Sequence, residues 1–148
     1  MSKLPHAGNF RDLIVYQKAR SLSSEIFHVS KSFPKEEAFS LTNQVRRSSR
    51  SIGAQIAEAW GKRRYENHFI SKLTDSDAEQ YETQHWLMTA KDCGYLSELD
   101  THALTRQCEE IGRMLNGMIS KSRHFCGSQP ETIRESVPEY LVNLNEER

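Results

Sequence analysis

Apolar residues recur at alternating steps of four and three along the N-terminal part of the chain. They are Val15, Ala19, Leu22, Ile26, Val29 and Phe33. This spacing draws one apolar stripe along a helix, which is the pattern by which helices pack side by side. Asp12 is expected to cap the start of this helix. Pro34 should end it near Ser32, because a residue before proline is pushed out of the α conformation.

The next stretch, residues 41–60, predicts a second helix with three different faces. Its apolar stripe falls within roughly 100° of the helix circumference and consists of Leu41, Val45, Ile52, Ile56 and Trp60. Small residues flank the stripe and let neighbouring backbones approach, namely Ser48, Ser49, Ser51, Gly53, Ala54 and Ala57. Arg46, Arg47 and Arg50 point away from the stripe. Gly61 is a natural stop for this helix.

Two further helices follow, and no proline interrupts residues 35–129. The third is predicted over residues 66–92, with a polar middle and an inner side marked by Phe69, Leu73, Leu87 and Met88, and Gly94 should close it. The fourth is expected to run from a cap at Ser97 to about residue 123. Its seam again follows steps of four and three, with Ser122 in one polar slot: Leu104, Cys108, Ile111, Leu115, Met118 and Phe125.

Four long helices with short joints predict an all-α fold, an antiparallel up-down-up-down four-helix bundle. Residues 1–9 form a polar lead and residues 10–126 form the bundle domain. Residues 127–148 form an acidic tail that is expected to be mobile, with two Lys/Arg against five Asp/Glu. Residues 34–70 have the opposite balance, with seven Lys/Arg against four Asp/Glu.

Composition narrows the class of protein. The net charge is zero, so no general attraction to nucleic acid or to an anionic membrane is expected. No apolar run is long enough to span a membrane, and no signal peptide is visible. Cys93, Cys108 and Cys126 lack any paired spacing, which indicates free thiols in a reducing cytoplasm.

A four-helix bundle raises the question of a di-iron site, because Glu25 with His28 and Glu82 with His85 both match E-x-x-H. On their helices these side chains point mostly away from the apolar seams, whereas metal ligands must point inward. The sequence also lacks a nucleophile motif and a glycine-rich phosphate loop. We therefore predict no enzymatic activity, no metal and no cofactor.

The basic residues are the one feature with a functional interpretation. The candidates for nucleic-acid or subunit contact are Arg46, Arg47, Arg50, Lys62, Arg63 and Arg64. Arginine clusters of this kind can hold phosphates through paired, charge-assisted hydrogen bonds. The alternative, which the neutral net charge favours, is that they pair with carboxylates such as Glu58 or Glu82, or with those of a neighbouring subunit.

Three blocks of the sequence resemble a known family. They are FRDLIVYQKA at 10–19, FPKEEAFSLTNQVRRSSRSIGAQIAEA at 33–59 and YETQHWLMTAKDCGYL at 81–96. In this order they resemble the bacterial four-helix-bundle proteins encoded in 23S rRNA intervening sequences, which are similar to the accessory proteins of diversity-generating retroelements. The resemblance implies a ring-shaped homo-oligomer, typically a pentamer, with no established enzymatic activity.

Two functions follow as expectations. The first is a scaffold that presents the ring surface to a protein or RNA partner. The second, implied by the retroelement relatives, is an accessory module that binds nucleic acid or a reverse transcriptase through Arg46, Arg47 and Arg50. In a ring, the polar middle of the third predicted helix, with Asp75, Asp77, Glu79 and Gln80, would meet the arginines of the next subunit.

Overall fold

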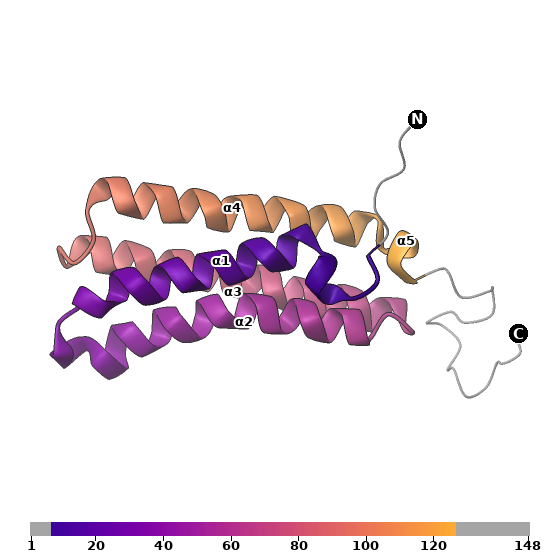
Figure 1. The fold of residues 1–148 in the computed structure, drawn as a ribbon, viewed down its shortest axis with the longest axis horizontal. Coiled ribbons are helices and arrows are strands. Elements are labelled where there is room, and N and C mark those ends of the chain that lie inside the picture. The colour runs from indigo at the N-terminus through magenta and orange to yellow at the C-terminus, as the bar shows by residue number, and fades with distance from the viewer. Residues whose placement is uncertain (1–6, 127–148) are drawn as a thin grey trace, which may run out of the picture.

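The computed structural model describes residues 7–126, and within this range every regular element is helical. Four long helices lie side by side along the longest axis of the molecule (Figure 1). Their bounds are α1 Ile14–Val29, α2 Asn43–Gly61, α3 Glu66–Asp92 and α4 Glu98–Ser120. Shorter elements are η1 Phe10–Asp12, η2 Ser30–Ser32, η3 Lys35–Glu37, η4 Ala38–Thr42 and α5 Ser122–Cys126. The predicted C-terminal tail lies outside the described residues.

Each long helix packs against two others. The most extensive contact joins α2 to α3, followed by α3 with α4, α1 with α2, and α1 with α4. The predicted seam residues Val15, Ala19, Leu22 and Ile26 are buried, as are Leu104, Cys108, Ile111 and Leu115 in α4. The heptad-like spacing therefore predicts correctly which sides of α1 and α4 build the core.

The start of the first helix differs from the prediction. Asn9, rather than Asp12, is the capping residue, and its side chain accepts a hydrogen bond from the Arg11 amide at 2.7 Å. Asp12 instead reaches back, and its carboxylate accepts from the amides of Gly8 and Asn9 at 2.8 and 3.2 Å. This reciprocal capping box lies at the start of η1. The long helix α1 begins only at Ile14, and its N-cap residue, Leu13, makes no side-chain capping hydrogen bond.

The end of α3 and the start of α4 follow the predicted signals. Gly94 has a φ of +83°, and the amides of Gly94 and Tyr95 donate to the carbonyls of Lys91 and Ala90, both at 2.9 Å. This is the Schellman arrangement that a glycine after a helix allows. Ser97 caps α4 by accepting from the Asp100 amide at 3.0 Å. The fourth helix ends at Ser120 rather than near residue 123, and the short α5 follows after Lys121.

The α3 seam contains polar residues that an apolar pattern does not reveal. Its buried positions run in unbroken steps of four and three: Phe69, Leu73, Ser76, Gln80, Thr83, Leu87 and Ala90. The Ser76 hydroxyl donates to the Ile52 carbonyl of α2 at 2.8 Å, so it links two helices. Met88 was predicted to face inward, but it is 47% exposed because Leu87 and Ala90 occupy the seam at that level.

Gln80 is buried and fills the space beside Gly112 of α4. Its amide nitrogen donates to Asp77 at 2.9 Å, and its amide oxygen accepts from Gln84 at 2.7 Å. A Cβ at Gly112 would lie 2.8 Å from the Gln80 amide nitrogen and 3.2 Å from the Asp77 carboxylate. The polar seam therefore fits against α4 only because residue 112 has no side chain.

This fit predicts opposite effects at two glycines of the same helix. Gly112→Ala should lower the free energy of unfolding by about 1 kcal/mol, because Gln80 is held by two partners and cannot yield easily. Gly117 has no atom within 4 Å of an added Cβ, so Gly117→Ala should raise it by about 0.5–1 kcal/mol through helix propensity alone. Urea unfolding followed by circular dichroism measures both. Equal effects would show that the contact with Gln80 carries no cost.

Candidate functional site

The six basic residues singled out in the sequence form two groups. Arg46, Arg47 and Arg50 lie on α2, whereas Lys62, Arg63 and Arg64 lie after its end. Arg50 and Lys62 are twelve positions apart in the sequence, which corresponds to about 18 Å along the helix axis. Each group therefore has its own surroundings.

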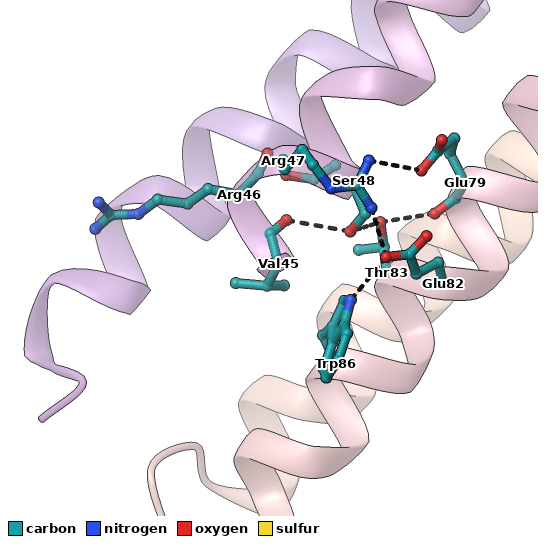
Figure 2. A network of polar contacts seen from close by, with 9 residues as sticks. Val45, Arg46, Arg47, Ser48, Glu79, Glu82, Thr83 and Trp86 are labelled. Atoms are coloured by element: carbon teal, nitrogen blue, oxygen red, sulfur yellow. Dashed lines mark hydrogen bonds and ion pairs between the residues drawn. The ribbon is translucent and has the colours of Figure 1, made fainter. Parts of the chain in front are cut away.

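Arg47 is paired within its own chain. It forms ion pairs with Glu82 at 2.5 Å and with Glu79 at 3.7 Å, both on α3. Figure 2 shows Arg46 and Arg47 pointing in opposite directions although they are adjacent in sequence. Glu82 was among the carboxylates expected to pair with an arginine. Glu58, the other one, instead pairs with Lys72 at 2.9 Å.

The two glutamates beside Arg47 have opposite electrostatic surroundings. The pKa of Glu79 is raised above its ordinary value, chiefly by burial, and Arg47 only partly opposes that effect. One Glu79 oxygen is buried and accepts no hydrogen bond. The pKa of Glu82 is lowered, first by a hydrogen bond from the Trp86 indole at 3.0 Å and then by Arg47. Among the described residues, Arg47 is the only cation within ion-pair distance of Glu79.

Buried hydroxyl groups continue this network between α2 and α3. The Ser48 and Thr83 hydroxyl oxygens lie 2.9 Å apart, and the Thr83 hydroxyl lies 2.9 Å from the Glu79 carbonyl (Figure 2). Both residues are fully buried. The sequence identifies Ser48 only as a small packing residue and does not single out Thr83. Neither side chain is charged or strongly apolar, so the apolar periodicity gives no sign of their hydrogen bond.

Arg46 stabilises the end of α1. Its guanidinium donates to the Ser30 hydroxyl at 2.7 Å and to the Phe27 carbonyl at 3.4 Å. It also lies over the Phe27 ring, 4.7 Å from the centroid. The last carbonyls of a helix lack partners within the helix and attract positive charge. Arg46 therefore has a structural role in joining α1 to α2.

Arg50 is exposed, as Arg47 is, but it differs from Arg47 in its lack of an ion pair among the described residues. Its guanidinium lies 5.6 Å from the Phe27 centroid, and no carboxylate of the described residues is within ion-pair distance. Phe39, 82% exposed, stands on the same outer side of the molecule. Together they line a shallow hollow that we call the Phe39–Arg50 surface, whose other lining residues are Asn43, Gln44, Arg46, Arg47, Ser51 and Ala54.

The second basic group is partly engaged as well. The Arg63 guanidinium stacks on the Trp60 ring at 3.6 Å and donates to the Trp60 carbonyl at 2.9 Å. Burial lowers the pKa of Arg63. Trp60, predicted to belong to the core stripe, is only half-buried, and Ala59 is fully buried at this level instead. Lys62 and Arg64 are exposed.

The chain is similar to proteins of one known family. Residues 11–117 match the family model of the 23S rRNA-intervening sequence protein. The chain belongs to this family. It is also similar to a solved crystal structure, a protein of unknown function from the S23 ribosomal protein family of Bacteroides thetaiotaomicron. That protein is 28% identical, with a TM-score of 0.66 over 72% of this chain and 96% of its own. No curated protein matches the chain.

The two E-x-x-H matches lie apart from one another in this 23S rRNA-intervening sequence protein. The Glu25 carboxylate accepts from the Gln107 amide at 3.1 Å, whereas Glu82 is held by Arg47 and Trp86. His85 packs against the Trp86 ring with centroids 4.8 Å apart. Within residues 7–126, no group of three or more His, Cys, Asp or Glu side chains is placed to hold a metal ion.

The cysteines of this family member are free thiols. Cys108 is fully buried, and burial raises the pKa of its thiol to about 12. The pKa of Cys126 is raised to about 11 for the same reason. A thiol with such a pKa carries almost no thiolate at neutral pH and reacts slowly. As predicted from its seam position, Cys108 is a core residue. No helix of the described residues is long and apolar enough to cross a membrane.

Proposed function

We propose that this protein is a non-enzymatic interaction scaffold of the cytoplasm that self-associates into a ring-shaped homo-oligomer. The observation that carries the proposal is the Phe39–Arg50 surface. It combines an aromatic ring that is 82% exposed with arginines on the outer side of α2. Exposed aromatic and arginine side chains are enriched at the energetic centres of protein interfaces.

The subunit of this ring is proposed to be an antiparallel up-down-up-down bundle. Short joints support this order, since only four residues separate α2 from α3 and five separate α3 from α4. In Figure 1, the colour that follows the chain runs in opposite directions along successive long helices, which supports this order. Five subunits are expected from the family resemblance. The joint between α1 and α2 contains the short 3-10 helices η2 and η3 and the π-helix η4, and Phe39 lies exposed in η4.

The engagement of the arginines favours a scaffold over a nucleic-acid-binding module. Arg46 holds the end of α1, Arg47 is paired with two carboxylates, and Arg63 stacks on Trp60. A phosphate would have to compete with these contacts. Nucleic-acid binding is the second candidate, and Arg50 supports it because no carboxylate of the described residues pairs with it.

Light scattering after size-exclusion chromatography tests self-association. The wild-type chain should elute at a multiple of its 17.1 kDa subunit mass, and Phe39→Asp and Arg50→Glu should each shift the mass toward a single subunit. Arg50 is a better probe than Arg46, because Arg46 also stabilises α1. Leu99→Asp and Arg106→Glu are matched controls at exposed positions of α4 and should leave the mass unchanged.

Two results would overturn the proposal. One is a wild-type chain that elutes at the subunit mass at micromolar concentration, and the other is an unchanged mass for both Phe39→Asp and Arg50→Glu. RNA or DNA binding whose affinity falls by several log units per log unit of salt, and which is lost in Arg50→Glu, would establish the second candidate instead.

A further inference from the structure

A groove runs between α1 and α2 beside the Phe39–Arg50 surface. Its floor consists largely of small residues, Ala19 on α1 and Gly53, Ala54 and Ala57 on α2. Gly53 is buried, and a Cβ there would lie 3.5 Å from the Tyr16 ring, so the missing side chain leaves room beside Tyr16. The groove therefore exists because α2 has no large side chain facing this part of α1.

The lining of the groove indicates the chemistry of what fits it. Tyr16 packs edge-to-face against Phe10, with centroids 4.9 Å apart, and both rings line the groove. The two charged residues in the lining, Arg20 and Arg50, are both positive. A segment with an apolar face and a net negative charge would complement this surface, in the way that an amphipathic helix lies in a groove.

The same chain contains such a segment outside the described residues. In the acidic tail, Val137, Tyr140, Leu141 and Leu144 are spaced at i, i+3, i+4 and i+7. This spacing is typical of a helix with one apolar face, and Pro138 suits the first turn of a helix. Residues 127–148 contain five acidic residues against two arginines. Segment and groove thus match in apolar surface and are opposite in charge.

The tail also starts close enough to reach the groove. The described residues end at Cys126 in α5, which lies at the end of the bundle where α1 begins and α2 ends (Figure 1). Residues 127–136 can span up to about 33 Å when extended. The whole of α1, with 16 residues, is about 24 Å long. Ten linking residues are therefore sufficient to bring residue 137 to any point of the groove.

We propose that residues 137–144 dock in the groove between α1 and α2 of the same subunit. Docking places apolar side chains over Tyr16 and the small floor residues, and the acidic charge of the tail near Arg20 and Arg50. Arg50 and Ala54 line both this groove and the Phe39–Arg50 surface. The docked tail therefore competes with any partner of that surface. The inference does not depend on self-association.

Disulfide trapping in the full-length chain tests the proposal. Cys93, the exposed native cysteine, is first replaced by serine, while the buried Cys108 and Cys126 are kept. Ala54→Cys, in the groove, is then combined with Leu141→Cys, in the tail. The control combines Leu141→Cys with Arg113→Cys, an exposed position on the opposite side between α3 and α4. Mild oxidation followed by peptide mapping counts the bonds within one chain.

The groove pair should form an intrachain disulfide at least about tenfold faster than the control pair, because docking raises the effective concentration of the two thiols. Adding Arg20→Glu and Arg50→Glu should slow the groove pair several-fold without changing the circular dichroism of the folded chain. Equal rates for the groove and control pairs would overturn the proposal. Bonds formed mainly between two chains would also overturn it, because they would place the segment on another subunit.

Discussion

Replacing Phe69 with alanine should lower the free energy of unfolding by about 3–5 kcal/mol, as expected for removing a fully buried aromatic side chain. Phe69 is 0% exposed and lies near the start of α3. Its ring stacks on Phe125 of α5, with centroids 5.7 Å apart. The substitution would therefore weaken both the bundle core and the contact that holds α5 against α3. Urea unfolding followed by circular dichroism at fixed protein concentration measures the effect.

Tyr81→Ala is the matched control for this substitution. Tyr81 is an aromatic residue of the same helix, but it is 63% exposed. Its replacement should change the free energy of unfolding by only about 0.5 kcal/mol, which is typical of surface positions. The concentration must be the same for both variants, because self-association would add to the apparent stability. A loss at Phe69 no larger than that at Tyr81 would contradict the burial on which the α3 seam depends.

How much of the fold could be predicted depends on which residues mark each seam. The seams of α1 and α4 are almost entirely apolar, so their spacing identified the buried sides. The bounds of α3, 66–92, were also predicted correctly, because Gly94 marks its end. The middle of the α3 seam was missed, since Ser76, Gln80 and Thr83 are buried there. Ser76 and Thr83 form hydrogen bonds with distant residues of α2, the Ile52 carbonyl and the Ser48 hydroxyl, which the local pattern of α3 does not reveal.

The sequence predicts which arginines lie on the surface of α2, but not which residues they contact. Sequence periodicity places Arg46, Arg47 and Arg50 away from the apolar stripe of α2, and all three do lie outside the core. It does not reveal that Arg46 reaches α1 while Arg47 reaches α3. Nor does it reveal that Glu79 and Gln80 find partners within their own chain. Glu79 and Gln80 thus have partners inside one subunit, whereas a contact of this polar stretch with the arginines of the next subunit stays a prediction.

The ion pairs of Arg47 should contribute more to stability than a surface ion pair does. Arg47→Met keeps most of the aliphatic stem and removes the charge, which leaves Glu79, whose side chain is 20% exposed, without a cation. The free energy of unfolding should fall by about 1–3 kcal/mol at pH 7, the usual cost of a buried polar group that loses its partner. Lys18→Met is the matched control. Its partner Glu110 lies 3.3 Å away in an exposed pair, so the loss there should be at most about 0.5 kcal/mol.

The pH dependence of this loss separates an electrostatic cause from a packing cause. Burial raises the pKa of Glu79 in the folded state above its ordinary value of 4.5. A carboxyl group with a raised pKa in the folded state makes the fold less stable as the pH rises above the pKa of the unfolded state. This destabilisation is larger once Arg47 is absent. The pKa of Glu82 is lowered, in part by Arg47, so the stability it contributes above its unfolded pKa also shrinks without the arginine. Both effects make the loss in Arg47→Met largest at pH 7 and smaller below about pH 4.

Adding Glu79→Gln to Arg47→Met should restore part of the stability at pH 7 and little at pH 4. A loss that is the same at both pH values would mean that Arg47 acts only through the packing of its stem.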